Sequence, residues 1–278
     1  MANASYAARQ PPAVEGEKPV HVLVTGFGSF LDKYPKNSSW EIASTLPALI
    51  PASPGNPTPI HIRVHHEPIR VAYENVVNTV PRLLSPDSSA FPPDIVLHIG
   101  LAASRSFYAI EQGAHSRGYG KTADVNGDLF LDAAAQDLFP KETYPEMLST
   151  GFDTADVLSR WRTSLGYSTP SGSPSIEELP DIRINPDAGN FLCGFIYYNS
   201  LAHYHAQNGG DGERPVVFMH VPDLSGSEEK LREGWEVAVA LIKALVESMR
   251  KVGVSGGGEG KEAGLGGQED DARNNTAV

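Results

Sequence analysis

The sequence predicts an α/β fold, a three-layer α/β/α sandwich around a largely parallel twisted sheet. Apolar runs of strand length recur along the chain, and segments with helical spacing of apolar residues separate them. Consecutive βα units of this kind place their strands parallel in one sheet and their helices on both faces. Several of the runs lack any polar alternation, which indicates strands covered on both sides.

Five segments have the length and composition of strands. Residues 20–25, 94–100 and 216–221 are almost entirely apolar, as central strands of a parallel sheet are. Residues 60–65 and 181–184 alternate polar and apolar side chains, which is typical of strands with one exposed face.

Helices are expected between and after these strands. They cover 38–43, 71–80, 153–165, the segment from 192 onward and the segment 231–249, whose apolar stripe is the clearest.

Three local signals mark the expected helix ends. Ser38 is an expected cap of the first helix. Pro81 should end or kink the second, since proline has no N–H to donate. Ser225, with Glu228 three residues later, has the pattern of a capping box before the last helix.

The chain is expected to hold one α/β domain over residues 19–252. Residues 1–18 show no periodicity and predict a disordered lead-in, and residues 253–278 are Gly-rich and acidic and predict a disordered tail. Within the domain, residues 120–180 carry clusters of Gly, Asp, Ser and Pro, which predict a long insertion of loop or lid character.

Composition excludes several classes of protein. The formal net charge of −12 over 278 residues argues against a surface for nucleic acid or anionic membrane. The single cysteine, Cys193, excludes an intramolecular disulfide and a multi-cysteine zinc site, and it fits a reducing compartment. Without an apolar stretch of signal-peptide or membrane-spanning length, the chain is expected to be soluble and cytoplasmic.

Cys193 is expected where a strand turns into a helix. Asn185, Pro186 and Asp187 have turn chemistry, and Gly189 allows the sharp bend that follows. The amide donors and dipole of a first helical turn favour a thiolate. On position alone, a buried thiol that packs like an apolar residue is an equally good interpretation.

Two further residue types complete the set that a cysteine hydrolase requires. His220 lies at the end of the last strand, and Glu111 follows an expected loop over residues 102–110. An imidazole can pair with a thiolate and protonate a leaving amine, and a carboxylate can orient the imidazole. Taken singly, a strand histidine is usually a core residue and a lone acid is usually solvated.

Four segments, in order, resemble pyroglutamyl peptidase type I, a family of cysteine peptidases. They are residues 22–30 with 37–41, residues 98–114, residues 184–198 around Cys193, and residues 217–222. The resemblance implies that Cys193 is the nucleophile, His220 the general acid/base and Glu111 the third member of the triad. It implies an ω-peptidase that removes an N-terminal pyroglutamyl residue from peptides through a thioester, without metal or organic cofactor, and it leaves a homo-oligomer open.

The resemblance also implies a pocket for the neutral pyroglutamyl ring. Phe27 and Phe30 would supply apolar walls, and Asn37 is similar to a position near the pocket, although it is equally suited to cap a helix. Arg105 would help to bind or shape the site, or orient Glu111. Two positions depart from the family pattern: Leu101 stands where bacterial members carry Gln, and Gly194 where Asn or Asp is frequent.

Three other interpretations remain. A glutamine-amidotransferase-like hydrolase would carry His-x-Glu late in the chain, whereas Glu111 precedes Cys193. A non-catalytic binding protein could keep the same fold with a degenerate pocket. A metal site at His65-His66 or at His203-Tyr204-His205 is disfavoured, because adjacent histidines rarely chelate together and His-x-His on a helix does not share a face.

Overall fold

A computed structural model describes residues 17–30, 35–85, 91–167 and 179–256. Most of the expected lead-in at 1–18 and of the expected tail at 253–278 lies outside these ranges. Nine strands are found in the described part: β1 (Val20–Gly26), β2 (Leu49–Ile50), β3 (Ile60–Val64), β4 (Ile95–Leu101), β5 (Tyr108–Glu111), β6 (Gly113–His115), β7 (Met147–Ser149), β8 (Ile182–Asn185) and β9 (Val216–Val221). Its six helices are α1 (Ser38–Ala43), α2 (Tyr73–Leu84), α3 (Asp132–Leu138), α4 (Thr154–Ser164), α5 (Leu192–Gln207) and α6 (Glu228–Lys251).

Seven of the strands form one mixed sheet in the order β2-β3-β1-β4-β9-β5-β8. Strands β3, β1, β4 and β9 are parallel neighbours, as the βα pattern predicts. Strand β2 is antiparallel to β3, and β5 is antiparallel to β9 but parallel to β8. The predicted largely parallel sheet is confirmed for its centre.

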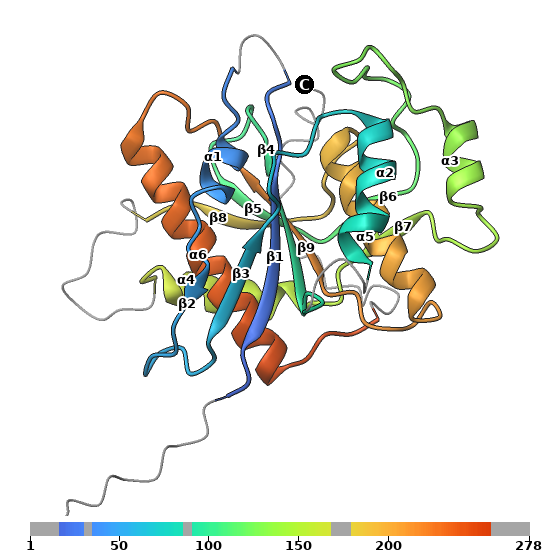
Figure 1. The fold of residues 1–278 in the computed structure, drawn as a ribbon. Coiled ribbons are helices and arrows are strands. Elements are labelled where there is room, and N and C mark those ends of the chain that lie inside the picture. Colours follow the sequence, from blue (N-terminus) through green and yellow to red (C-terminus); the bar gives the residue numbers. More distant parts are fainter. Residues whose placement is uncertain (1–16, 31–34, 86–90, 168–178, 257–278) are drawn as a thin grey trace, which may run out of the picture.

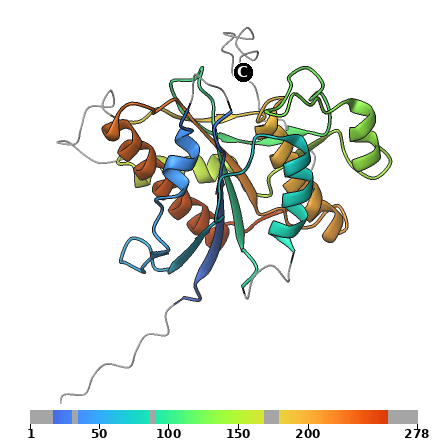
Figure 2. The same cartoon turned by 45° about the horizontal axis from the view of Figure 1, so that its top comes forward.

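Helices cover both faces of this sheet, which confirms the three-layer sandwich (Figures 1 and 2). Helices α1, α4 and α6 pack on one face over a core that includes Ile42, Trp161 and Leu241. Helices α2 and α5 pack on the other face over a core that includes Val76 and Phe195. Helix α3 lies at the periphery beyond them (Figure 1). In the described part of the chain, no helix has the length and apolar character needed to cross a membrane.

Pro81 does not end its helix, and two of the expected caps, Ser225 and Ser38, are wrong. Helix α2 continues past Pro81 to Leu84, because Leu83 and Leu84 bury their side chains and hold the last turn in place. Helix α6 is capped by Ser227, whose side chain accepts from the Lys230 amide at 3.3 Å, and not by Ser225. At the start of α1 the cap is Asn37, as its position also allowed, rather than Ser38.

The segment expected to be mainly loop has more regular structure than its composition indicates. Helix α3, strand β7 and the expected helix α4 all lie between residues 120 and 167. Its far end, residues 168–178, lies outside the described residues. The expectation that 102–110 is a loop is also wrong at its end: Tyr108–Glu111 is β5, an inner strand of the sheet.

Candidate active site

Cys193 is the second residue of α5, immediately after the turn that leaves β8. Gly189 adopts φ +79°, a conformation that glycine takes without strain, and its amide donates to Asp187 Oδ1 at 2.8 Å. The first bond of the helix runs from Phe195 N to Phe191 O at 3.0 Å, so the amides of Cys193 and Gly194 precede the helical ladder. These amides can stabilise an anion at this helix start.

Two glycines let the chain close around the thiol. A Cβ at Gly100 would lie 2.6 Å from the Phe218 ring and 2.9 Å from Cys193 Sγ, so the sulfur rests directly over the β4 backbone. A Cβ at Gly194 would lie 1.9 Å from the Gly189 carbonyl oxygen. The departure at Gly194 therefore has a structural reason: the turn before α5 packs too tightly there for any side chain.

We expect Gly100→Ala to reduce the rate at which iodoacetamide alkylates Cys193 by about tenfold or more, because the added methyl must displace either the thiol or Phe218. Overpacking of this kind also costs about 1–3 kcal/mol of unfolding free energy. Iodoacetamide labelling of the thiol and urea unfolding measure the two effects. Gly55→Ala is the matched control, since nothing lies within 4 Å of a Cβ at Gly55; an unchanged labelling rate in Gly100→Ala would contradict the close approach.

His220 and Glu111 meet although 109 residues separate them. His220 Nδ1 lies 2.7 Å from Glu111 Oε1, and Cys193 is close enough to His220 to raise the pKa of the imidazole through its charge and a side-chain hydrogen bond. The register of the β5–β9 ladder explains the meeting, because Glu111 pairs with Phe218 and His220 is its diagonal neighbour on the same face. The structure thus brings the three expected catalytic residues into one chain of contacts.

Glu111 is fully buried and accepts bonds from three side chains. Arg105 Nη1 lies 2.7 Å from Oε1, the oxygen that also faces His220. Asn185 Nδ2 lies 2.6 Å from Oε2. Sequence reasoning gave Asn185 only a turn role; its contact with Glu111 follows from the pairing of β5 with β8, in which the two residues are register partners.

Burial and neighbouring charges have opposite effects on the pKa values of His220 and Glu111. Burial alone would lower the pKa of His220, but the charges of Cys193 and Glu111 and hydrogen bonds to both raise it to about 9. Burial alone would raise the pKa of Glu111, but His220, Arg105 and Asn185 hold it below its ordinary value. An imidazolium beside a carboxylate is therefore the resting state at neutral pH.

This pairing predicts a specific dependence on pH. The raised pKa of His220 contributes stability that is complete below 6.5 and is lost as the pH rises through about 9. The lowered pKa of Glu111 contributes stability that is present above 4.5 and is lost at more acidic pH. We expect the difference in unfolding free energy between the wild type and His220→Gln to be largest between about pH 4.5 and 6.5. Urea titrations across this range measure it; a difference that grows above pH 9 would contradict the assignment.

The second buried histidine near the sheet has a different environment. His98 bonds to Thr25 Oγ1 at 2.7 Å and Ser200 Oγ at 2.9 Å, and burial lowers its pKa to about 3. It is a neutral structural residue, so His220 is the imidazole available for proton transfer at this thiol.

A narrow pocket opens beside the thiol. Its empty space is about 280 Å³ including the mouth, and its lining is almost entirely apolar. The lining residues are Phe27, Phe30, Asn37, Val71, Leu101, Phe191, Leu192 and Cys193. Three of the four residues expected to bind substrate, Phe27, Phe30 and Asn37, are therefore here. Arg105 does not line this pocket and contacts Glu111 instead.

Asn37 caps α1 and lines the pocket at the same time. Its Oδ1 accepts from the Ser39 amide and hydroxyl, and its Nδ2 donates to the Gly28 carbonyl at 2.9 Å. One of the two amide hydrogens is used in this way. Apart from Cys193, Asn37 is the one residue with a polar side chain among those that line this pocket.

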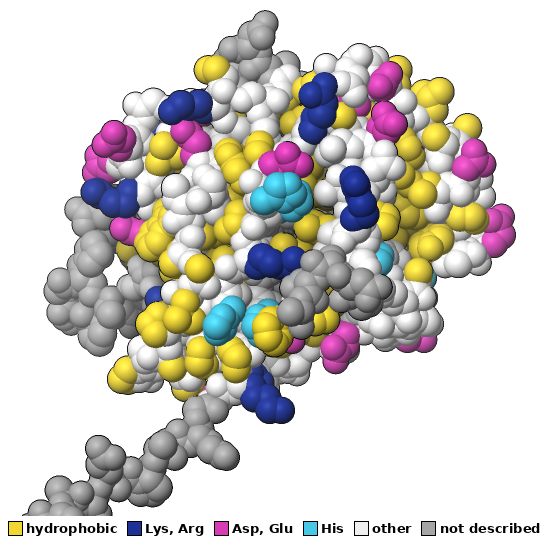
Figure 3. Space-filling view, viewed as in Figure 1, with side chains coloured by type: hydrophobic (Ala, Val, Ile, Leu, Met, Phe, Trp, Pro, Cys, Tyr) yellow, Lys and Arg dark blue, Asp and Glu magenta, His cyan; other side chains and the backbone are white. Residues whose placement is uncertain are grey.

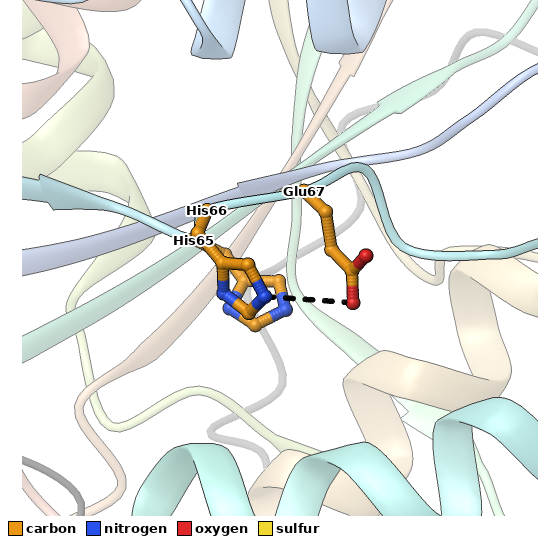
Figure 4. Close-up of side chains that lie close together, drawn as sticks. All are labelled: His65, His66 and Glu67. Carbon is orange, nitrogen blue, oxygen red and sulfur yellow. Dashed lines mark ion pairs between the residues drawn. The ribbon is translucent and has the colours of Figure 1, made fainter.

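One group of three metal-ligating side chains, His65, His66 and Glu67, is found among the described residues (Figure 4). Their ligand atoms lie within 4.8 Å of one another, and Glu67 adds a carboxylate beside the two adjacent histidines. His66 and Glu67 are exposed and pair with each other at 3.6 Å.

On the face shown in Figure 3, basic side chains lie singly among acidic and apolar ones, without the continuous basic surface that nucleic acid requires.

Comparison with known proteins places this site in context. No protein-family model matches the chain. Human pyroglutamyl-peptidase 1 is 27% identical over 203 residues, which cover 73% of this chain and 79% of the human one. The pyrrolidone carboxyl peptidase structures from Thermococcus litoralis and Thermus thermophilus are 19% and 24% identical, with TM-scores of 0.60 and 0.54. They cover 84% and 82% of this chain and 96% and 99% of their own. The resemblance found in the sequence is confirmed, and the fold is that of these peptidases.

Proposed function

We propose that the protein is a cysteine ω-peptidase that removes an N-terminal pyroglutamyl residue from peptides. The observation that carries the proposal is the contact chain from Cys193 through His220 to Glu111, which lies beside an apolar pocket. The similarity to pyroglutamyl-peptidase 1 supports the choice of substrate.

Cys193 acts as the nucleophile in this proposal. Its thiolate attacks the carbonyl carbon of the pyroglutamyl residue, and the amides of Cys193 and Gly194, which precede the helical ladder of α5, bind the resulting oxyanion. His220 gives its proton to the nitrogen of the departing amine, and the C–N bond breaks to leave a thioester. Water then attacks the thioester while His220 takes its proton, which releases pyroglutamate and restores the thiolate. Glu111 keeps the imidazole oriented and balances its charge.

Substrate recognition depends on a small neutral lactam. Phe27, Phe30 and Leu101 enclose the ring with apolar surface, which an uncharged ring requires and a free α-amine would not tolerate. The unused amide hydrogen of Asn37 donates to the lactam carbonyl, so Leu101 need not supply a polar contact. Arg105 acts indirectly, through Glu111. The partners are peptides with an N-terminal pyroglutamate, and the single thiol suits a cytoplasmic, reducing environment.

Fluorogenic amides of pyroglutamate, proline and alanine test the proposal on the wild-type chain. Hydrolysis of the pyroglutamyl amide alone is the expected result, because the prolyl amide has a similar ring but carries a charged amine. Equal hydrolysis of the prolyl amide would contradict the lactam specificity. A folded protein inactive on all three amides would favour a binding protein on the same fold.

A further inference from the structure

Asn185 connects two parts of the site that come from different segments. Its Nδ2 donates to Glu111 Oε2 at 2.6 Å and to the backbone carbonyl of Asp187 at 2.7 Å. Both hydrogens of the amide are thereby used. One partner is the buried carboxylate, and the other belongs to the turn that leads to Cys193.

The sheet fixes the amide from which these bonds extend. Asn185 is the last residue of β8 and the register partner of Glu111, and its own carbonyl accepts from the Gln112 amide at 2.8 Å. The turn beyond it is held as well, because Ala188 N donates to Gly113 O at 3.0 Å. The side chain therefore extends from a rigid strand end, where it can hold its partners in a set geometry.

The Glu111 carboxylate needs a hydrogen-bond donor at its second oxygen as well. Oε1 already accepts from His220 and Arg105, which approach from one side. Without Asn185, Oε2 would have none of the side-chain partners described for it and would be a buried unsatisfied acceptor, a costly state that the carboxylate would relieve by rotating. Rotation would carry Oε1 away from the imidazole.

We propose that Asn185 is a positioning residue of this site: its amide ties Glu111 to the turn before Cys193 and thereby keeps the imidazole of His220 aligned with the thiol. The inference rests on the proposed peptidase function only for its kinetic readout. The geometry requires no particular substrate.

Asn185→Asp gives the most specific test. Two carboxyl groups in contact share a proton, and while they do, the protonated group can donate to Glu111 as the amide did. A protonated carboxyl has only one hydrogen, so the bond to the Asp187 carbonyl is lost, and we expect kcat on a pyroglutamyl amide to be about threefold to tenfold below the wild type at acidic pH. Once the shared proton is lost, the two carboxylates repel each other and kcat falls. This fall should occur at a pH well below 9, where loss of the His220 proton sets the basic limit of the wild type. KM changes little, because Asn185 does not line the pocket.

Asn185→Leu should lower kcat about 10-fold to 100-fold at every pH, since no protonation state restores the donor. Asn56→Asp is the matched control: Asn56 is a buried asparagine whose Nδ2 donates to the Thr58 carbonyl at 3.1 Å, away from the site. A wild-type pH profile for Asn185→Asp, together with an unchanged kcat for Asn185→Leu, would overturn the proposal. So would the same shift of profile in Asn56→Asp.

Alkylation of Cys193 by iodoacetamide separates this inference from the substrate assignment. Cys193 is the only cysteine, so labelling of the full chain reports on this thiol without any substrate. We expect Asn185→Leu to slow labelling at pH 6 about fivefold, because the imidazolium that pairs with the thiolate is misplaced. If the wild type does not cleave the pyroglutamyl amide but Asn185→Leu still labels more slowly than the wild type, the positioning role is supported and the proposed substrate is wrong. If a folded Asn185→Leu labels at the wild-type rate, the positioning role fails.

Discussion

Replacing Cys193 with serine should lower hydrolysis of a pyroglutamyl amide by about 10⁴-fold or more. A serine hydroxyl does not form a stable anion beside an imidazolium, so the proposed mechanism loses its attacking group. The pocket keeps its other seven lining residues, so substrate binding should change much less than the rate. Rates measured at saturating substrate test this directly.

Iodoacetamide labelling provides the control for this substitution. The wild type should incorporate one equivalent and lose activity in proportion, whereas Cys193→Ser should incorporate none, because the chain has no other cysteine. A thermal unfolding midpoint near that of the wild type would show that the loss is chemical. Activity that survives in Cys193→Ser would mean that the nucleophile lies elsewhere.

Glu111→Gln should lower kcat by about 10³-fold to 10⁴-fold, which is the effect of neutralising the orienting carboxylate in other triads. The amide cannot satisfy all its neighbours: with its oxygen toward His220 and Arg105, its NH₂ meets the NH₂ of Asn185. With the reverse orientation, its NH₂ meets His220 and Arg105, both of them donors. Arg105 is also left without its counter-charge beside the imidazole, 3.5 Å from Nδ1.

The pH profile of Glu111→Gln distinguishes this cause from general damage. Without the carboxylate charge, the pKa of His220 should fall from about 9 toward its ordinary 6.5, and the alkaline limit of kcat/KM should fall with it. Breaking a buried ionic network should also cost about 3 kcal/mol or more of unfolding free energy. Glu233→Gln is the matched control, because Glu233 accepts from Tyr108 of the same strand at 2.8 Å but does not contact His220. If the alkaline limit of kcat/KM does not shift in Glu111→Gln, Glu111 is not the third member of the triad.

The central strands could be predicted because a strand buried on both faces is apolar along almost its whole length. Strand β9 begins and ends where its apolar run does, and β1 and β4 extend the predicted runs by one residue at the carboxyl end. Strand β5 left no such trace. Its four residues, Tyr108 to Glu111, end on a charged side chain that is buried only because three donors surround it. Composition alone treats that acid as exposed and therefore predicts a loop at this place.

The direction of the strands could not be predicted either. Parallel strands meet at one edge of a sheet with their carboxyl ends, which would bring the turn before Cys193 near His220 but gives no place to Glu111, which follows an expected loop. Strands β5 and β8 in fact run opposite to β9, and Glu111 reaches His220 from part-way along the ladder. The pairing of β5 with β9, which the sequence does not indicate, is what brings Glu111 to His220.

The sequence by itself determined the layered α/β fold, the helix start at Cys193 and, through four motifs in order, the family that the chain resembles. These features are encoded locally, in the period of apolar residues and in short runs of defined spacing. Only the tertiary structure decided how Glu111 is held, that Arg105 acts on Glu111 rather than in the pocket, and that Asn185 joins the carboxylate to the turn before the nucleophile. Those contacts join residues from 2 to 109 positions apart. Their geometry depends on strand direction and register, which the pairing of strands sets and no local pattern records.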